Sequence, residues 1–111
     1  MPLRESPNQL ELLLMLALIR LGDDAYGVRI AREIEDRTGR TIPIASVYAA
    51  LARLEKKGLV VSRVGEPTPE RGGRAKIYFR ITPKGLRAAR QAHSALARLA
   101  TGIPRLAGAK A

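Results

Sequence analysis

Side chains that could do covalent or acid–base chemistry are scarce in this chain. It has no cysteine and a single histidine, His93, which is followed directly by Ser94. Adjacent residues of a helix point about 100° apart, so these two cannot pair as base and nucleophile. Without cysteine there is no disulfide and no thiolate zinc site, and no glycine-rich phosphate-binding motif occurs. The sequence therefore argues against an enzyme and against a metal protein.

Charge is the chemical feature that stands out. The 111 residues include 20 Lys and Arg against 10 Asp and Glu, a formal net charge of +10. Residues 1–70 are formally neutral, whereas residues 71–111 hold ten basic side chains and no acidic one. This asymmetry is typical of a protein that binds a polyanion, either nucleic acid or an anionic membrane surface. GC-rich coding could explain the preference for arginine, but it does not explain the missing acids.

Membrane association is the weaker of these two interpretations. The longest apolar run, residues 12–19, is far shorter than the roughly 20 residues that span a bilayer. The arginines near the C-terminus do not oppose a large aromatic face, as those of a membrane-surface helix would. The N-terminal residues also lack the pattern of a secretory signal. We therefore expect a soluble, cytoplasmic protein without membrane contact.

Four helices and one hairpin are predicted to position the basic residues. Capping residues and apolar spacing mark the helices, and β-branched residues mark the strands. Gly27, inside the second helix, indicates either close backbone packing or a tolerated surface glycine. The predicted elements are helix 7–21 (cap Ser6, Pro7), helix 25–38 (cap Asp23, Asp24), a helix from Pro43 to Gly58, strands 59–64 and 76–81 around a loop 65–74, and helix 83–100 (cap Thr82, Pro83).

This order of elements predicts a winged helix-turn-helix. The fold class is mainly α with a two-stranded β wing, followed by a C-terminal dimerisation helix. Ile77, Phe79 and Ile81 alternate with Tyr78 and Arg80, which is the pattern of a strand. We expect a DNA-binding domain over residues 1–82, a dimerisation helix over 83–101 in the same compact unit, and a flexible tail over 102–111.

The third predicted helix has one apolar and one basic side. Its apolar stripe is Ile44, Val47, Tyr48, Leu51 and Leu54. The opposite side is small near its start and basic near its end, which suits a helix that approaches base edges with one end and phosphates with the other. The hairpin cations flank a Gly-Gly turn that could reach the DNA backbone or minor groove. The candidate DNA-contacting residues are Ser46, Tyr48, Ala49, Arg53, Lys56, Lys57, Arg71, Arg74 and Lys76.

Each of these assignments has a structural alternative. Ser46 could serve only as a helix-cap hydroxyl, and Tyr48 could pack in the core with its hydroxyl reaching a phosphate. The hairpin cations could belong to a solvated loop. These alternatives stay open on the sequence alone.

Two helices carry more apolar surface than one small domain is expected to bury. The first is apolar around nearly its whole circumference, and the last has apolar residues at the 3-4 spacing of a coiled-coil seam, including Ile103. The seam could instead cover the first helix of the same chain. His93 on this seam would be a pH-sensitive contact or a solvated edge residue. The candidate dimer-interface residues are Leu12, Met15, Leu16, Ile19, Leu86, Ala89, His93, Leu96 and Ala100.

Several segments of the sequence together carry a resemblance to a known family. They are Tyr26-Gly27 with Ile30, 46–51, 54–60, 72–74 and 78–85. These segments resemble the PadR family of bacterial transcriptional regulators, in the short subfamily with a single C-terminal helix. The resemblance runs from about residue 10 to residue 99 and implies a homodimeric repressor that binds DNA with its third helix and wing and dimerises through its last helix. Pro43 stands where the family is expected to have a capping Ser or Thr.

The function expected from these observations is sequence-specific DNA binding at a palindromic operator, with no cofactor or metal. The resemblance also implies a small hydrophobic effector between subunits. Some short family members use tryptophans for this, and the chain has none, so aliphatic walls and an aliphatic ligand are expected. The alternative is a winged-helix nucleoid-associated or protein-interaction module with little sequence specificity.

Overall fold

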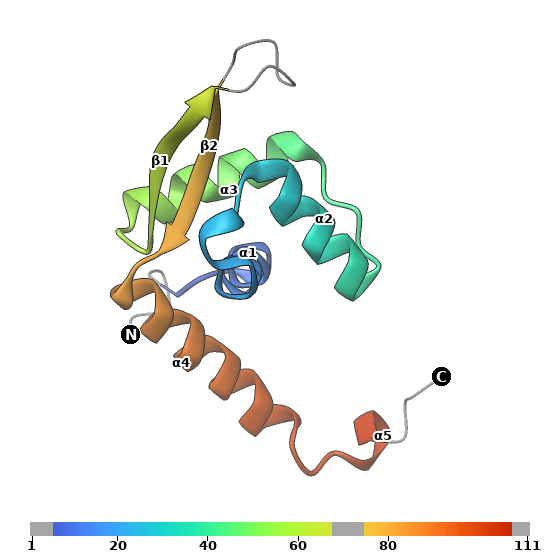
Figure 1. Ribbon diagram of the computed structural model, residues 1–111. Coiled ribbons are helices and arrows are strands. Elements are labelled where there is room, and N and C mark those ends of the chain that lie inside the picture. The colour runs from blue at the N-terminus through green and yellow to red at the C-terminus, as the bar shows by residue number, and fades with distance from the viewer. Residues whose placement is uncertain (1–5, 68–74, 108–111) are drawn as a thin grey trace.

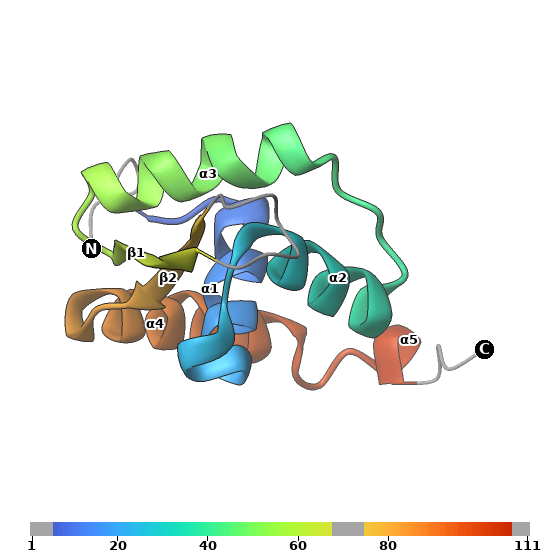
Figure 2. The ribbon, with the colours of Figure 1, turned by 45° about the horizontal axis from the view of Figure 1, so that its top comes forward.

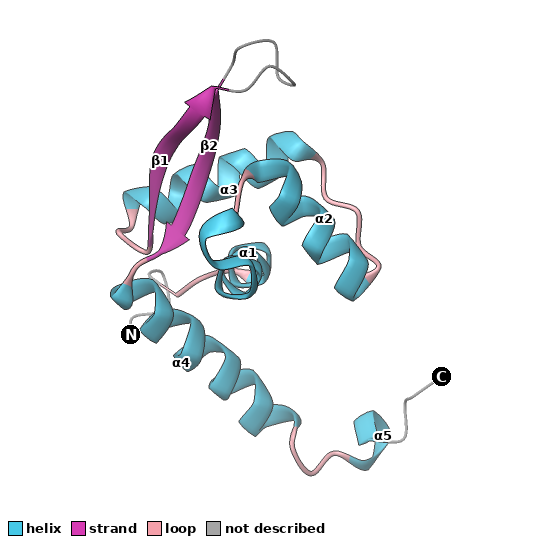
Figure 3. Ribbon diagram, in the orientation of Figure 1, coloured by secondary structure: helices cyan, strands magenta, loops and turns pink. Residues whose placement is uncertain are grey.

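The computed structural model describes residues 6–67 and 75–107. Three helices are followed by an antiparallel hairpin and a long helix, as the sequence predicts (Figure 1). The hairpin stands up from the helical body, and Figure 3 separates it by colour from the helices around it. The elements are α1 (Gln9–Leu21), η2 (Gly22–Asp24), α2 (Gly27–Thr38), α3 (Ile44–Lys56), β1 (Val60–Pro67), β2 (Ala75–Ile81), α4 (Pro83–Ala100) and α5 (Pro104–Ala107).

Helix α1 begins two residues later than predicted, and its cap is Asn8, not Ser6. The Glu11 backbone N–H donates to Asn8 Oδ1 at 2.8 Å, and the Asn8 backbone N–H donates to Glu11 Oε1 at 3.1 Å. This reciprocal capping box satisfies two backbone donors at once. Because Glu11 closes this box with Asn8, the helix starts at Gln9.

Helix α1 is the centre of the fold. Helices α2, α3 and α4 and strand β2 all pack against it, as Figure 2 shows from above. Leu14 and Met15 have no exposed surface, and Leu12 is only 7% exposed. The chain itself thus covers Met15 fully and Leu12 almost fully, while their place in a dimer interface stays a prediction. Leu16 is half-buried and Ile19 is exposed.

Helix α2 starts at Gly27, and Asp23 and Asp24 do not cap it. They form the 3₁₀ turn η2, and Tyr26 precedes the helix in an extended conformation. The reason lies far along the chain: the Phe79 backbone N–H donates to the Ala25 carbonyl at 2.8 Å, and Tyr26 forms a β bridge with Tyr78. These two contacts hold Ala25 and Tyr26 in an extended conformation at the edge of the sheet, so α2 begins only at Gly27.

Helix α3 presents a slightly different apolar stripe from the predicted one. Val47, Leu51 and Leu54 are fully buried as expected, but Ala50 is buried too, while Ile44 and Tyr48 are 43% and 42% exposed. The Tyr48 ring nevertheless leans over the start of α2. A Cβ added at Gly27 would collide with the end of that ring, so Gly27 is a close-packing glycine.

The hairpin pairs β1 with β2 in antiparallel register, with Ser62 opposite Phe79. Phe79 is buried and Ile81 is half-buried, whereas Ile77 is 46% exposed. Ile77 lies further out along the strand, beyond the reach of the helical core. The register shifts between Val64 and Pro67, and β1 continues to Pro67, into the region predicted as loop.

Helix α4 spans the predicted residues. Thr82 caps it by accepting a hydrogen bond from the Gly85 N–H at 3.0 Å, and Pro83 occupies the first turn. Its first half packs on α1, whereas its second half runs away from the body (Figure 1). The predicted tail contains one helical turn, α5. Within the described ranges, no helix is long and apolar enough to cross a membrane.

Candidate nucleic-acid interface

One side of α3 lies along the outside of the molecule, and no other element of the described residues lies over it (Figure 2). Ala49, Arg53 and Lys56 are exposed on this side, and Ser46 is half-buried at its start. Lys57, predicted beside them, is half-buried just past the last turn. The structure therefore brings these five candidates together as one face, small at one end and cationic at the other. We call it the α3 face.

Two of the cations of the α3 face are held by an acid that the sequence analysis missed. Glu11 is 1% exposed, and its Oε2 accepts a hydrogen bond from Arg53 Nε at 3.0 Å. Its Oε1 lies 3.0 Å from Lys57 Nζ. The signal in the sequence is the Asn8-x-x-Glu11 pattern at the start of an apolar helix, which predicts a capping box and so fixes where the acid points.

The environment of Glu11 favours its charged form. Burial raises its pKa, but hydrogen bonds from the Asn8 backbone N–H, Lys57 and Arg53 outweigh burial, so the pKa lies below its usual value. A group with a lowered folded-state pKa adds stability above its unfolded pKa and loses that contribution as pH falls through the folded pKa. The ion pairs of Glu11 should therefore stabilise the fold at neutral pH, and this contribution to stability should be lost as the pH becomes acidic.

Glu11→Gln is expected to lower the free energy of unfolding by about 1–3 kcal/mol at pH 7, the usual worth of hydrogen bonds to charged groups. Glutamine can keep the capping box, so the loss reports the charge. Urea denaturation at pH 7 and pH 3 checks this: the difference between wild type and variant should shrink at pH 3. A difference that is equal at both pH values would contradict the ion pair as its source.

Aromatic rings and cations cluster on the hairpin beside the start of α2. Lys76 Nζ lies 4.3 Å from the centre of the Tyr26 ring, and the Arg63 guanidinium lies 4.6 Å from the centre of the Tyr78 ring. The two tyrosine rings meet edge to face, with centres 5.6 Å apart. Lys76 is half-buried near the outer end of β2, and its contact with Tyr26 holds its side chain against the residue that precedes α2.

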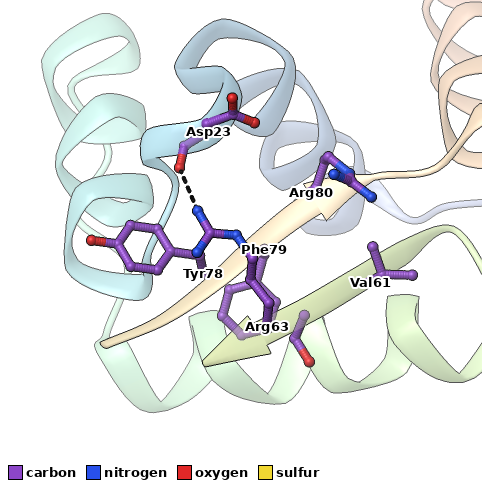
Figure 4. Close-up of a pocket in the computed structure, with 7 residues that line it drawn as sticks. Asp23, Val61, Arg63, Tyr78, Phe79 and Arg80 are labelled. Atoms are coloured by element: carbon purple, nitrogen blue, oxygen red, sulfur yellow. Dashed lines mark hydrogen bonds between the residues drawn. The ribbon is translucent and has the colours of Figure 1, made fainter. Parts of the chain in front are cut away.

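A small cavity of about 80 Å³ lies beside this cluster (Figure 4). Its wall includes Arg63, whose Nη2 lies 3.5 Å from the Asp23 carbonyl, the contact drawn as a dashed line. The wing is thereby tied to the turn before α2. Arg71 and Arg74, the other two predicted wing cations, lie outside the described residues.

A groove with a volume of about 750 Å³ runs between the start of α1 and the outer half of α4. The apolar residues of α4 that line this groove lie part of a turn around the helix from the predicted seam. Leu96 lies in it and is 58% exposed, but Ala89 faces the chain's own core, Leu86 is half-buried, and His93 and Ala100 are exposed outside it. The apolar residues that line the groove are Pro7, Leu12, Ala88, Ala92, Ala95, Leu96 and Leu99.

The start of α4 is fastened to the turn that follows α3. The Thr82 N–H donates to the Leu59 carbonyl at 3.0 Å, and Thr82 Oγ1 donates to the Gly58 carbonyl at 2.8 Å. Lys84 Nζ donates to the Lys57 carbonyl at 3.1 Å. The end of α3 is thus fixed by α4 on one side and by Glu11 of α1 on the other.

Among the described residues, no group of three or more histidine, cysteine, aspartate or glutamate side chains is arranged to hold a metal ion.

Comparisons with known proteins point to one family. A transcriptional regulator from Clostridium thermocellum is 30% identical and superposes with a TM-score of 0.71, covering 90% of this chain and 89% of that one. A PadR family transcriptional regulator from Eggerthella lenta is 29% identical, with a TM-score of 0.68 over 88% of this chain and 83% of its own. An uncharacterized protein from Lysinibacillus sphaericus is 40% identical over 74 residues, which are 65% of this chain and 64% of that protein.

The chain thus spans just under two thirds of the length of this curated relative. A model of the family described as "Transcriptional regulator PadR-like family" matches residues 15–91, a stretch that begins inside α1 and includes the whole α3 face, the hairpin and the first half of α4. Since this match extends over most of the chain, the protein belongs to the PadR-like family of transcriptional regulators.

Proposed function

We propose that this chain binds double-stranded DNA as a homodimer, recognises a palindromic operator and represses transcription there. The observation that carries the proposal is the α3 face, which nothing else in the described chain covers and which is small at one end and cationic at the other. In a helix-turn-helix this helix enters the major groove. Membership of a transcriptional-regulator family supports the same use of the helix.

The two ends of the α3 face would contact different parts of the DNA. Ser46 and Ala49 have short side chains, so the helix backbone can come close to base edges at this end. Arg53 and Lys56 lie one to two turns further on, where they would meet phosphates. Phosphate contacts add affinity without sequence information, whereas the close approach at Ala49 would supply specificity.

The groove beside α4 supports the homodimer. Leu96 and Leu99 are 58% and 77% exposed on a helix that leaves the body, and a second copy of the chain would cover them. A two-fold dimer presents two α3 faces, so its half-sites should lie about one or two helical turns of DNA apart.

The same groove would hold a small effector between the subunits. Among the described residues, those that line it are mostly aliphatic, with Leu12, Ala92 and Leu99 among them, a few are polar, and none is aromatic. Such walls suit an aliphatic or shape-tolerant ligand better than a flat stacked one.

Two variants of α3 should separate specific from non-specific binding. Lys56→Ala is expected to weaken operator and random DNA alike and to reduce the slope of log affinity against log salt by about one. Ala49→Leu is expected to cost about 1–3 kcal/mol on the operator for each base step it disturbs, and to leave the salt slope unchanged. Filter-binding titrations at several salt concentrations measure both, on an operator selected from random DNA fragments.

The outcome also decides between the proposal and the low-specificity module. If Ala49→Leu weakens binding to operator and random DNA equally, α3 does not make base-specific contacts and the chain binds DNA without sequence specificity. A reporter gene placed behind the selected operator tests repression separately, because its expression should fall when the chain is produced. Unchanged or increased expression would contradict the repressor assignment.

A further inference from the structure

Glu11 is the only buried charged side chain in the described part of the molecule. It lies on α1, yet both of its ion-pair partners lie at the end of α3, 42 and 46 residues further along the chain. Its own orientation is fixed by the Asn8 backbone N–H, which shares Oε1 with Lys57. Because the position of the Glu11 carboxylate is fixed, the carboxylate can fix the positions of the Arg53 and Lys57 side chains.

The contact with Arg53 leaves part of the guanidinium free for another partner. Glu11 Oε2 binds the inner nitrogen, Nε, and the Arg53 side chain stays 47% exposed. A guanidinium has five N–H donors, and the four on its two terminal nitrogens are not used by this bond. An arginine anchored through Nε has already lost much of the rotamer freedom that it would otherwise lose on binding a phosphate.

We infer that Glu11 is a positioning residue for DNA binding, which holds Arg53 through Nε so that the terminal nitrogens face the phosphate backbone. The inference rests on the proposed function, because it assumes that DNA contacts the α3 face. Simple electrostatics predicts the opposite effect for this acid. An extra negative charge beside two cations should repel DNA, and its removal should tighten binding.

Glu11→Gln separates these two expectations. Glutamine keeps an oxygen for the capping box and removes the charge that orders Arg53. We expect affinity for the selected operator to fall about tenfold, and the slope of log affinity against log salt to fall by about one, as for a lost phosphate contact. This should occur although the net charge rises by one. Filter binding at several salt concentrations measures both quantities.

Glu55→Gln is the matched control. Glu55 is exposed on α3 itself, and its carboxylate accepts a hydrogen bond from Ser62 Oγ at 2.7 Å rather than binding Arg53 or Lys57. The substitution makes the same change in net charge, and we expect unchanged or tighter binding. If Glu11→Gln also binds as tightly as wild type or more tightly, Glu11 only competes with DNA for the two cations and the inference is overturned.

Arg53 variants show whether Glu11 acts through this residue. Arg53→Ala alone should weaken binding, and Glu11→Gln added to it should cause little further loss; a full additional loss would overturn the inference. Arg53→Lys keeps the charge, but one ammonium cannot hold Glu11 and a phosphate in the same geometry, so its loss should approach that of Arg53→Ala. Wild-type binding by Arg53→Lys would overturn the inference even if Glu11→Gln fails to fold.

The same set of variants separates this inference from the proposed function. If Arg53→Ala and Lys56→Ala both leave DNA affinity unchanged, the α3 face does not contact DNA, and the proposed interface fails together with the role of Glu11. If both weaken binding while Glu11→Gln strengthens it, the interface stands and only the positioning role is wrong.

Discussion

Replacing Gly85 with alanine is expected to lower the melting temperature by roughly 10 °C, which corresponds to about 3 kcal/mol for a chain of this size. An added Cβ would collide with the Leu59 carbonyl oxygen and lie 2.8 Å from Ile81 Cγ1. That carbonyl accepts the Thr82 N–H, so it cannot turn aside without breaking the attachment of α4. The ordinary gain of about 1 kcal/mol from glycine to alanine in a helix is too small to offset this collision.

Gly27→Ala is the matched control for this prediction. Gly27 also lies in the first turn of a helix, but the three atoms nearest to its added Cβ all belong to the end of the Tyr48 side chain. Tyr48 is 42% exposed and can rotate towards solvent, so we expect a stability within about 1 kcal/mol of wild type. Thermal unfolding followed by circular dichroism compares the two variants. A wild-type melting temperature for Gly85→Ala would contradict the close approach of α4 to Leu59.

Leu96→Asp is expected to convert the proposed dimer into a monomer at micromolar concentration. Leu96 lies in the groove beside α4, and a second copy seated there would bury the new carboxylate without a partner, at a cost of several kcal/mol. Because a dimer holds two half-sites at once, operator affinity should fall by about 10²–10⁴-fold. The charge should also abolish binding of an aliphatic effector in the groove. Sedimentation and filter binding measure the first two effects.

Ala97→Asp makes the same change of charge one residue further on. Ala97 is exposed and does not line the groove, since one residue turns the side chain by about 100° around the helix. This variant should remain dimeric and bind the operator with an affinity within a few-fold of wild type. Wild-type protein that sediments as a monomer at micromolar concentration would refute the dimer itself.

Local signals in the sequence were enough to predict most of the fold. The Thr82 cap of α4 and the end of α2 at Gly39 each depend on neighbouring residues. The sequence left two interpretations of Gly27 open, and the structure decides for close packing. The start of α2 could not be predicted in this way. It depends on the bond from Phe79 to the Ala25 carbonyl, which forms only when β2 has folded against this segment.

Only part of the candidate interface could be predicted, because sequence patterns report contacts within one helix and not contacts between residues far apart in the chain. The spacing of Arg53 and Lys56 on α3 predicts a cationic face, and the structure places them together. The pairing of Arg53 with Glu11 joins residues 42 apart in sequence, and helical periodicity carries no information about such a pair. Ala89, counted in the predicted seam of α4, packs with Ala88 on the chain's own core, and coiled-coil spacing alone cannot distinguish such a contact within the chain from one between subunits.

The central position of α1 has a consequence for the synthesis of the chain. Helix α1, against which α2, α3, α4 and β2 pack, is made before these elements, and α4 is the last of the four to be made. About 60 residues separate the end of α1 from the start of α4, which takes about 3–12 seconds at 5–20 residues per second. During that delay the apolar surface of α1 is open to chaperones and to other nascent chains, so a chain released before α4 is complete should be aggregation-prone and a substrate for proteolysis.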